Sequence, residues 1–151
     1  MRYCLYGLLI VLIAALPTAA HDVENVPTVV IDSDLGIDDA VTLALALQCP
    51  QIRIAGVVAC EGVTGRDASA RTLGRMLNEF NSGDVPLYAA VAAGADKPAP
   101  PFRGLAEQTI GKALQGTPKN PLPFTPKAYV DKRNDKTVVL ALGPLTNIAA
   151  A

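Results

Sequence analysis

The stretch VVIDSDLGIDDAVTLALAL, residues 29–47, joins a β-branched apolar run to a run rich in alanine and leucine. The first run predicts a buried strand over Thr28–Ile31, and the second predicts a largely buried helix over Asp38–Leu47. Where the two runs meet, the chain places the aspartates Asp32, Asp34, Asp38 and Asp39. A strand that leads into a helix predicts a β-α unit, so these carboxylates would lie at the carboxyl end of the strand.

The rest of the sequence continues to alternate between strand-like and helix-like runs. In chain order we expect a strand over Ile52–Cys60, a helix over Arg66–Phe80, a weaker strand over Val85–Ala90, a strand over Lys136–Leu142, and a helix after Gly143 with Pro144 in its first turn. The proline-rich segment Ala95–Pro126 is expected to be a long loop with a short helix near Leu105–Leu114. The alternation predicts an α/β fold, namely a mainly parallel sheet of Rossmann-type topology with helices on both faces. In such a sheet, ligands bind outside the carboxyl ends of the strands.

Length and charge limit the classes of partner. The chain has 151 residues, enough for at most one domain, and a formal net charge of −1. Such a composition provides no basic surface for a nucleic acid, so we expect no nucleic-acid partner.

Residues 1–20 have the features of a secretory signal peptide. Arg2 precedes an apolar run of about twelve residues, which is too short to span a bilayer, and the small residues Thr18 and Ala20 precede the expected cleavage site. We therefore expect a mature chain that begins near His21, is secreted or periplasmic, and has no stable membrane insertion after cleavage. An uncleaved membrane anchor is the alternative.

Two cysteines would remain in the mature chain, in a compartment that permits disulfides. Cys49 is expected at the end of a helix and Cys60 at the far end of the next strand, so they would lie at opposite edges of the sheet. That separation is too large for a bridge, and we predict two free thiols.

The aspartate cluster needs an explanation beyond helix capping, which accounts for one or two carboxylates at most. Clustered carboxylates repel one another unless a cation lies among them, and oxygen ligands suit Ca²⁺ or Mg²⁺. An EF-hand loop is excluded, because its sixth and twelfth positions counted from Asp32 are Ile37 and Leu43 rather than glycine and glutamate. A phosphatase with a strand-end Asp-x-Asp nucleophile stays open, although its motif usually continues with Gly-Thr and here Leu35 and Gly36 follow.

Two motifs resemble the inosine–uridine-preferring nucleoside hydrolases. VVIDSDLGIDDAVTLALAL is similar to the family's signature, a strand followed by Asp-x-Asp-Pro-Gly-x-Asp-Asp-Ala, with Leu35 in place of the proline. LALGPLTNIA, residues 140–149, is similar to the family's Leu-Gly-Pro-Leu-Thr-Asn segment. The resemblance covers Pro27–Ala151, with residues 91–135 poorly matched. It implies calcium-dependent hydrolysis of the N-glycosidic bond of ribonucleosides, giving ribose and a free base, by an enzyme that could be a homo-oligomer.

The resemblance also implies roles for individual residues. Asp34 and Asp39 match the family's carboxylate ligands to Ca²⁺, and the backbone carbonyl of Leu142 matches a further ligand. Asp38 matches the residue that binds the ribose hydroxyls. Asp32 matches an aspartate that supports the site from behind the ligands. Asp34 also matches the general base that takes a proton from water.

The chain departs from the family pattern at several points. Val63 stands where the family has an asparagine that contacts substrate, so Glu61 or Thr64 could take that role, or the substrate differs. Glu61 is equally well explained as a solvated loop carboxylate. Thr146 and Asn147 are expected to serve in capping and turn bonding. The sole histidine of the sequence is His21, so no histidine acid can be assigned.

Family members are longer than this chain, so residues 21–151 are expected to be the N-terminal part of a nucleoside hydrolase-like domain that is truncated here. Two functions besides nucleoside hydrolysis remain open. One is the phosphatase, and the other is a non-catalytic or truncated relative that binds calcium or ribose.

Overall fold

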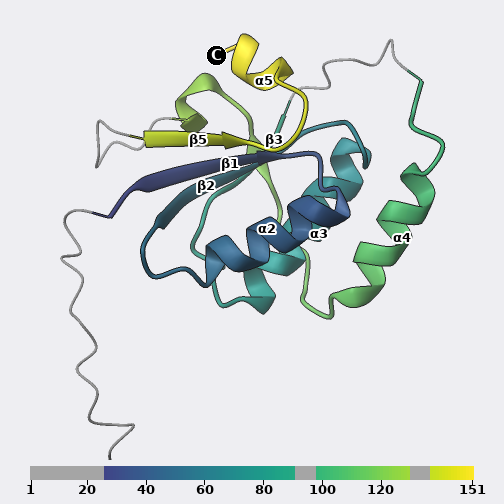
Figure 1. Ribbon diagram of the computed structural model, residues 1–151, viewed down its shortest axis with the longest axis horizontal. Helices are drawn as coiled ribbons and strands as arrows, with labels where there is room; N and C mark the ends of the chain where they lie inside the picture. Colours follow the sequence, from purple (N-terminus) through teal and green to yellow (C-terminus); the bar gives the residue numbers. More distant parts are fainter. Residues whose placement is uncertain (1–25, 91–97, 130–136) are drawn as a thin grey trace, which may run out of the picture.

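The computed structural model describes residues 26–90, 98–129 and 137–151. In these ranges parallel strands form a five-stranded sheet with the order β4-β3-β2-β1-β5. The strands are β1 (Thr28–Ser33), β2 (Arg53–Ala59), β3 (Leu87–Ala89), β4 (Leu122–Pro123) and β5 (Thr137–Ala141). β1 lies inside the sheet between β2 and β5 (Figure 1), so its carboxyl end has a neighbouring strand on each side. The predicted α/β fold with a parallel sheet is confirmed.

Helices lie on both faces of the sheet, but the longer ones share one face. These are α2 (Ile37–Leu47), α3 (Arg66–Glu79) and α4 (Arg103–Ala113) (Figure 1). The opposite face carries the 3-10 helix η2 (Pro126–Tyr129) and the short helix α5 (Thr146–Ala149). The sheet therefore separates two apolar layers of unequal size.

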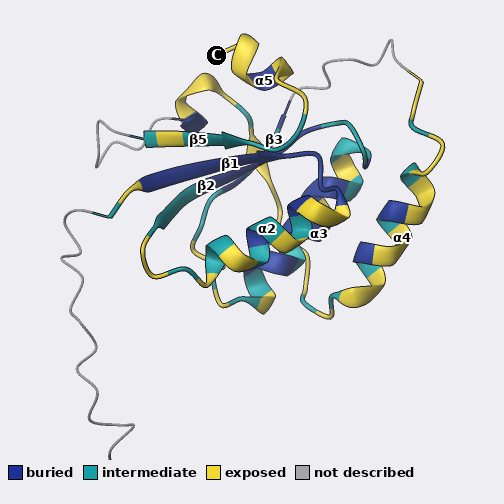
Figure 2. Ribbon diagram, in the orientation of Figure 1, coloured by how far each residue is buried: buried dark blue, intermediate teal, exposed yellow. Residues whose placement is uncertain are grey.

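The alternation of side chains along β1 builds both layers. Val29 and Ile31 pack into the core beneath α2 and α3, while Val30 packs on the other face with Ala128 and Tyr129 of η2. β1 is buried along its whole length (Figure 2), and each such aliphatic side chain contributes roughly 1.5–3 kcal/mol on burial. A strand that is buried on both faces holds the residues at its carboxyl end in fixed positions.

The strands and helices with strong periodicity begin and end within two residues of their predicted positions. The predicted burial of α2 is wrong, because Asp39 and Leu43 are its buried residues, while Val41 and Leu45 are exposed on the face away from the sheet.

The short helix expected near Leu105–Leu114 is confirmed as α4. The rest of the predicted loop Ala95–Pro126 is partly wrong, because the two-residue strand β4 lies in it and η2 begins at Pro126. The last helix was also predicted too early: α5 begins at Thr146, so Pro144 precedes it instead of lying in its first turn.

Residues 1–20, for which a signal peptide is predicted, and His21 lie outside the described residues. Within the described ranges, the helices are too short or too polar to cross a membrane. Cys49 is half-buried, Cys60 is buried, and both are free thiols as predicted.

Candidate functional site

The carboxyl ends of β2, β1 and β5 meet around the aspartate cluster. Backbone hydrogen bonds continue the sheet past the strands: Cys60 N–H donates to the Ser33 carbonyl (3.0 Å), and Leu142 N–H donates to the Asp32 carbonyl (2.8 Å). Leu142 therefore lies beside the end of β1. The predicted carboxylates divide by exposure into the buried Asp32, Asp34 and Asp39 and the exposed Asp38.

Asp39, in the first turn of α2, is joined to the end of β1 by Ser33. Ser33 Oγ donates to Asp39 Oδ2 (2.7 Å) and accepts a hydrogen bond from Leu35 N–H (2.9 Å). Because side chains alternate along a strand, Ser33 faces α2 while Asp32 faces the opposite side of the sheet. One hydroxyl therefore fixes both the turn after β1 and the carboxylate that follows it.

Asp34 is held by the loop between β2 and α3. Val63 N–H donates to Asp34 Oδ2 (2.8 Å), and the Asp34 carbonyl accepts from both Thr64 N–H (3.1 Å) and Thr64 Oγ1 (2.8 Å). Gly143, just beyond β5, also approaches closely, because a Cβ at this position would lie 2.9 Å from Asp34 N. Asp34 is 7% exposed, so its carboxylate has a defined position with a small solvent-facing surface.

Gly62 leaves space for the Asp34 carboxylate, since a Cβ at this position would overlap it. We expect Gly62→Ala to displace the carboxylate, weaken the bond from Val63, and lower the free energy of unfolding by about 1–3 kcal/mol. Urea denaturation measures this change. The matched control is Gly111→Ala in α4, where no atom lies within 4 Å of the added Cβ, and a gain of about 0.5–1 kcal/mol is expected. An unchanged free energy of unfolding in Gly62→Ala would contradict the close approach of Gly62 to the Asp34 carboxylate.

Asp32 is 1% exposed and is the centre of a buried polar network on the η2 side of the sheet. Tyr129 OH donates a short hydrogen bond to Asp32 Oδ2, and Asn147 Nδ2 donates to the same oxygen (3.0 Å). Burial, followed by the hydrogen bond to Asp32, raises the pKa of Tyr129, so the phenol stays protonated and acts as the donor. Asp32 thus connects β1 to η2 and α5, which agrees with a supporting role.

The structure corrects three expectations for neighbouring residues. Asn147 does not cap α5: its side chain bonds Asp32, and the helix has no side-chain cap. Thr64 is 1% exposed and bonded to Asp34, so it does not replace the family asparagine. Glu61 is not a freely solvated loop carboxylate, because it pairs with Arg103 of α4 (3.0 Å). At Val63, the backbone N–H makes the contact to the site.

The turn after Asp34 has a strained backbone. Leu35 has a φ of 55°, in the left-handed region, and its side chain is 1% exposed. Proline, which the family motif has at this position, fixes φ near −65° and could not adopt this conformation. With Leu35 in place of proline, the backbone of this turn adopts a conformation that proline does not allow. The strained residue lies beside the carboxylate cluster.

The paired carboxylates have the electrostatics of a cation site. Burial raises the pKa of Asp39 to about 6; the hydrogen bond from Ser33 opposes this shift, and the carboxylate of Asp34 adds to it. A divalent cation beside Asp34 and Asp39 would remove the repulsion, so the pair fits calcium in kind. Among the described residues, no three Asp, Glu, His or Cys side chains gather to hold a metal ion. Because Ca²⁺ takes six to eight oxygens, backbone carbonyls, water or substrate would have to supply the rest.

Known proteins are similar to this chain in sequence and in fold. A pyrimidine-specific ribonucleoside hydrolase, RihA of Enterobacter sp. (strain 638), is 34% identical over 131 residues, which are 80% of this chain and 41% of that protein. RihA of Shewanella sp. (strain MR-7) is also 34% identical over 131 residues, 80% of this chain and 40% of that protein. The chain thus spans about two fifths of the length of the curated relatives it matches.

Solved structures agree on the fold. A plant nucleoside hydrolase, the PpNRh1 enzyme, superposes with a TM-score of 0.70 at 23% identity, covering 83% of this chain and 42% of that one. A purine-preferring ribonucleoside hydrolase from Gardnerella vaginalis gives 0.67 at 20% identity, covering 82% of this chain and 42% of that one.

The match of the family model covers the site as well as the fold. The model described as inosine-uridine preferring nucleoside hydrolase matches residues 29–151, which include the aspartate cluster, the loop that holds Asp34, and Asn147. The chain therefore belongs to the inosine-uridine preferring nucleoside hydrolase family.

Proposed function

We propose that this chain is the N-terminal part of an enzyme that hydrolyses the N-glycosidic bond of ribonucleosides, in a calcium-dependent reaction that gives ribose and a free base. The observation that carries the proposal is the position of Asp34, a buried carboxylate at a strand end, oriented by the Val63 N–H and placed beside Asp39. Family membership supports the reaction class. RihA relatives are named for pyrimidine nucleosides, so uridine is the first substrate to test.

The groups proposed to hold calcium are the carboxylates of Asp34 and Asp39 and the backbone carbonyl of Leu142. When bound, the ion would supply positive charge that lowers the pKa of water and orients the ribose hydroxyls. The structure supports this assignment by placing the two carboxylates close enough for their charges to interact. The remaining oxygens that Ca²⁺ requires would come from water, substrate or other protein groups.

The chain's own carboxylates have distinct proposed tasks. Asp34 accepts a proton from the attacking water, whose oxygen bonds to C1′ while the C1′–N bond breaks and its electron pair leaves with the base. Asp38, exposed in the first turn of α2, binds the ribose hydroxyls. The negative charge of the cluster stabilises the oxocarbenium character that develops on the sugar.

The test is ribose release from uridine by the purified protein that contains this chain, measured with a reducing-sugar assay. We expect release with added Ca²⁺ and none with excess EGTA. Binding of Ca²⁺ should also stabilise the fold, by about 2.7 kcal/mol at a concentration 100 times the Kd, and thermal unfolding measures this gain. If Ca²⁺ changes neither ribose release nor thermal unfolding, the proposal fails.

Binding of calcium or ribose without turnover is a second candidate function. One observation favours it: the described residues provide a pair of adjacent carboxylates, Asp34 and Asp39, and no third acidic, histidine or cysteine side chain gathers with them. Saturable Ca²⁺ binding by calorimetry, together with no ribose release from uridine or inosine, would select this candidate.

A further inference from the structure

The loop Glu61–Gly65, here called the Asp34 loop, determines where the Asp34 carboxylate lies. Its hydrogen bonds to Asp34 come from Val63 and Thr64. Within the loop, Gly62 N–H donates to the Thr64 carbonyl (3.1 Å), which closes a tight turn. A displacement of this loop would therefore move the carboxylate with it.

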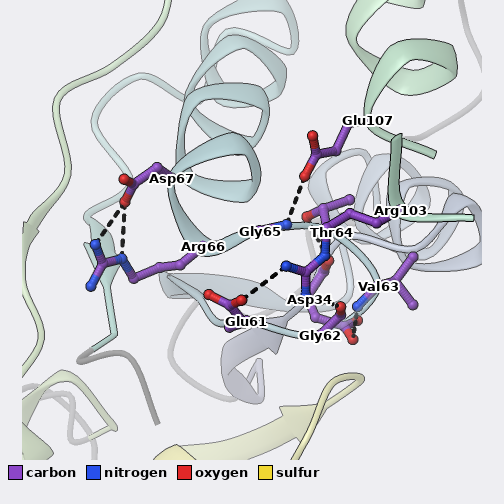
Figure 3. Close-up of polar contacts among 10 residues, drawn as sticks. All are labelled: Asp34, Glu61, Gly62, Val63, Thr64, Gly65, Arg66, Asp67, Arg103 and Glu107. Atoms are coloured by element: carbon purple, nitrogen blue, oxygen red, sulfur yellow. Dashed lines mark hydrogen bonds and ion pairs between the residues drawn. The ribbon is translucent and has the colours of Figure 1, made fainter. Parts of the chain in front are cut away.

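Helix α4 holds the Asp34 loop from the opposite side. Arg103 Nη1 contacts Glu61 Oε1 (3.0 Å), Arg103 Nη2 donates to the Gly62 carbonyl (2.8 Å), and Glu107 Oε1 accepts from Gly65 N–H (2.8 Å). Arg103 and Glu107 are four residues apart, so they project from one face of the helix. Figure 3 shows both side chains reaching from α4 to the loop, where they contact its first two residues and its last.

The contact to the Gly62 carbonyl reaches Asp34 through a single peptide group. The carbonyl of Gly62 and the N–H of Val63 belong to the same peptide, which is planar. Its oxygen accepts from Arg103, and its N–H donates to Asp34 Oδ2. Because the group is rigid, holding the oxygen fixes the direction of the N–H. A positive charge on the oxygen also polarises the peptide and strengthens its donor.

Arg103 differs from an ordinary surface cation. Its side chain is 22% exposed and that of Glu61 is 32% exposed, so the pair is partly shielded from solvent. Its Nε is buried and finds no hydrogen-bond partner among the described residues, which is an energetic cost of holding the guanidinium in this place. The two terminal nitrogens reach two different acceptors of one loop.

We propose that Arg103 is a positioning residue, which sets the orientation of the Asp34 carboxylate through the Gly62–Val63 peptide. The effect of Arg103 on the reaction rests on the proposed function of Asp34. The coupling between α4 and the Asp34 carboxylate rests on the hydrogen-bond geometry and does not depend on that function.

The experiment compares three variants with the parent chain. Arg103→Met removes both loop contacts and keeps the apolar stem, while Arg103→Lys keeps the charge and can restore one contact. The matched control is Glu79→Met, because Glu79 Oε2 accepts from Gln115 N–H (2.9 Å) and Gly116 N–H (3.1 Å), just beyond the other end of α4. Thermal unfolding verifies that each variant is folded.

The first readout is hydrogen exchange at the Val63 amide, followed by NMR. We expect Arg103→Met to accelerate this exchange about tenfold, Arg103→Lys to give an intermediate rate, and Glu79→Met to leave the rate unchanged. An unchanged rate in folded Arg103→Met would overturn the proposal. An equal acceleration in Glu79→Met would also overturn it, because general loosening of α4 would then explain the effect.

The second readout is steady-state hydrolysis of uridine. A misplaced general base should lower kcat about ten- to a hundredfold in Arg103→Met with little change in KM, and Arg103→Lys should recover part of the loss. An equal kcat in the parent and Arg103→Met would contradict the positioning role. If the parent chain releases no ribose, the proposed function fails, while exchange at Val63 still decides whether Arg103 controls Asp34.

Discussion

Replacing Asp34 with asparagine is expected to lower kcat/KM for ribose release by about 10²–10⁴-fold. The amide has nearly the same shape as the carboxylate and can still accept from the Val63 N–H. It cannot take a proton from water, and it contributes no negative charge to a calcium ion. Reducing-sugar assays at saturating Ca²⁺ measure the loss.

A surface aspartate provides the control for this change. Asp67 is exposed and pairs with its neighbour Arg66 (2.9 Å), away from the Asp34 contacts (Figure 3). We expect Asp67→Asn to retain hydrolysis within about twofold of the parent, as is usual for surface substitutions. Full activity in Asp34→Asn would remove this carboxylate from the mechanism.

The largest effect on stability is expected for Asp32→Ala. This change leaves the buried donors Tyr129 OH and Asn147 Nδ2 without their acceptor and opens a small cavity between β1 and η2. Each unsatisfied buried donor costs about 1–3 kcal/mol, so we expect the free energy of unfolding to fall by about 3 kcal/mol. Urea denaturation at neutral pH, monitored by circular dichroism, measures this loss.

Asp38→Ala is the matched comparison, since it removes an aspartate of the same cluster that is exposed in the first turn of α2. Its effect on the free energy of unfolding should stay within about 0.5 kcal/mol. Equal effects of the two changes would show that the Asp32 network does not support the fold.

The parts of the fold that the sequence predicted well are those where one local pattern suffices. β1 is a run of β-branched residues, and α3 repeats buried residues at helical spacing, so both were placed within two residues. β4 could not be predicted, because the two exposed residues Leu122 and Pro123 have no periodicity of their own. That strand exists because it pairs with β3, a long-range contact.

The sequence predicts those residues of the candidate site whose side chains belong to a recognisable motif. Tyr129 was missed, because it lies 97 positions from Asp32 in a stretch without a recognisable pattern. Asn147 lay within a quoted motif, but the local preference of asparagine for capping pointed to the wrong role. Val63 was judged by its side chain, whereas its backbone N–H makes the contact. Every residue except proline has a backbone N–H donor, so the identity of the residue at position 63 does not predict this hydrogen bond.

The place of β1 inside the sheet has a consequence for the order of folding. β1 to β4 and the helices between them can pair as neighbours along the chain, but the other edge of β1 pairs with β5, where Thr28 lies beside Thr137. The partners of Asp32 are equally distant, at separations of 97 and 115 positions. Contacts of such long range form late, because they require closure of a large loop. We therefore expect Asp32 and its partners to become ordered in the slowest step of folding, after most of the apolar core has been buried, whereas the contacts of Asp34 and Asp39 are closer in sequence and can form earlier.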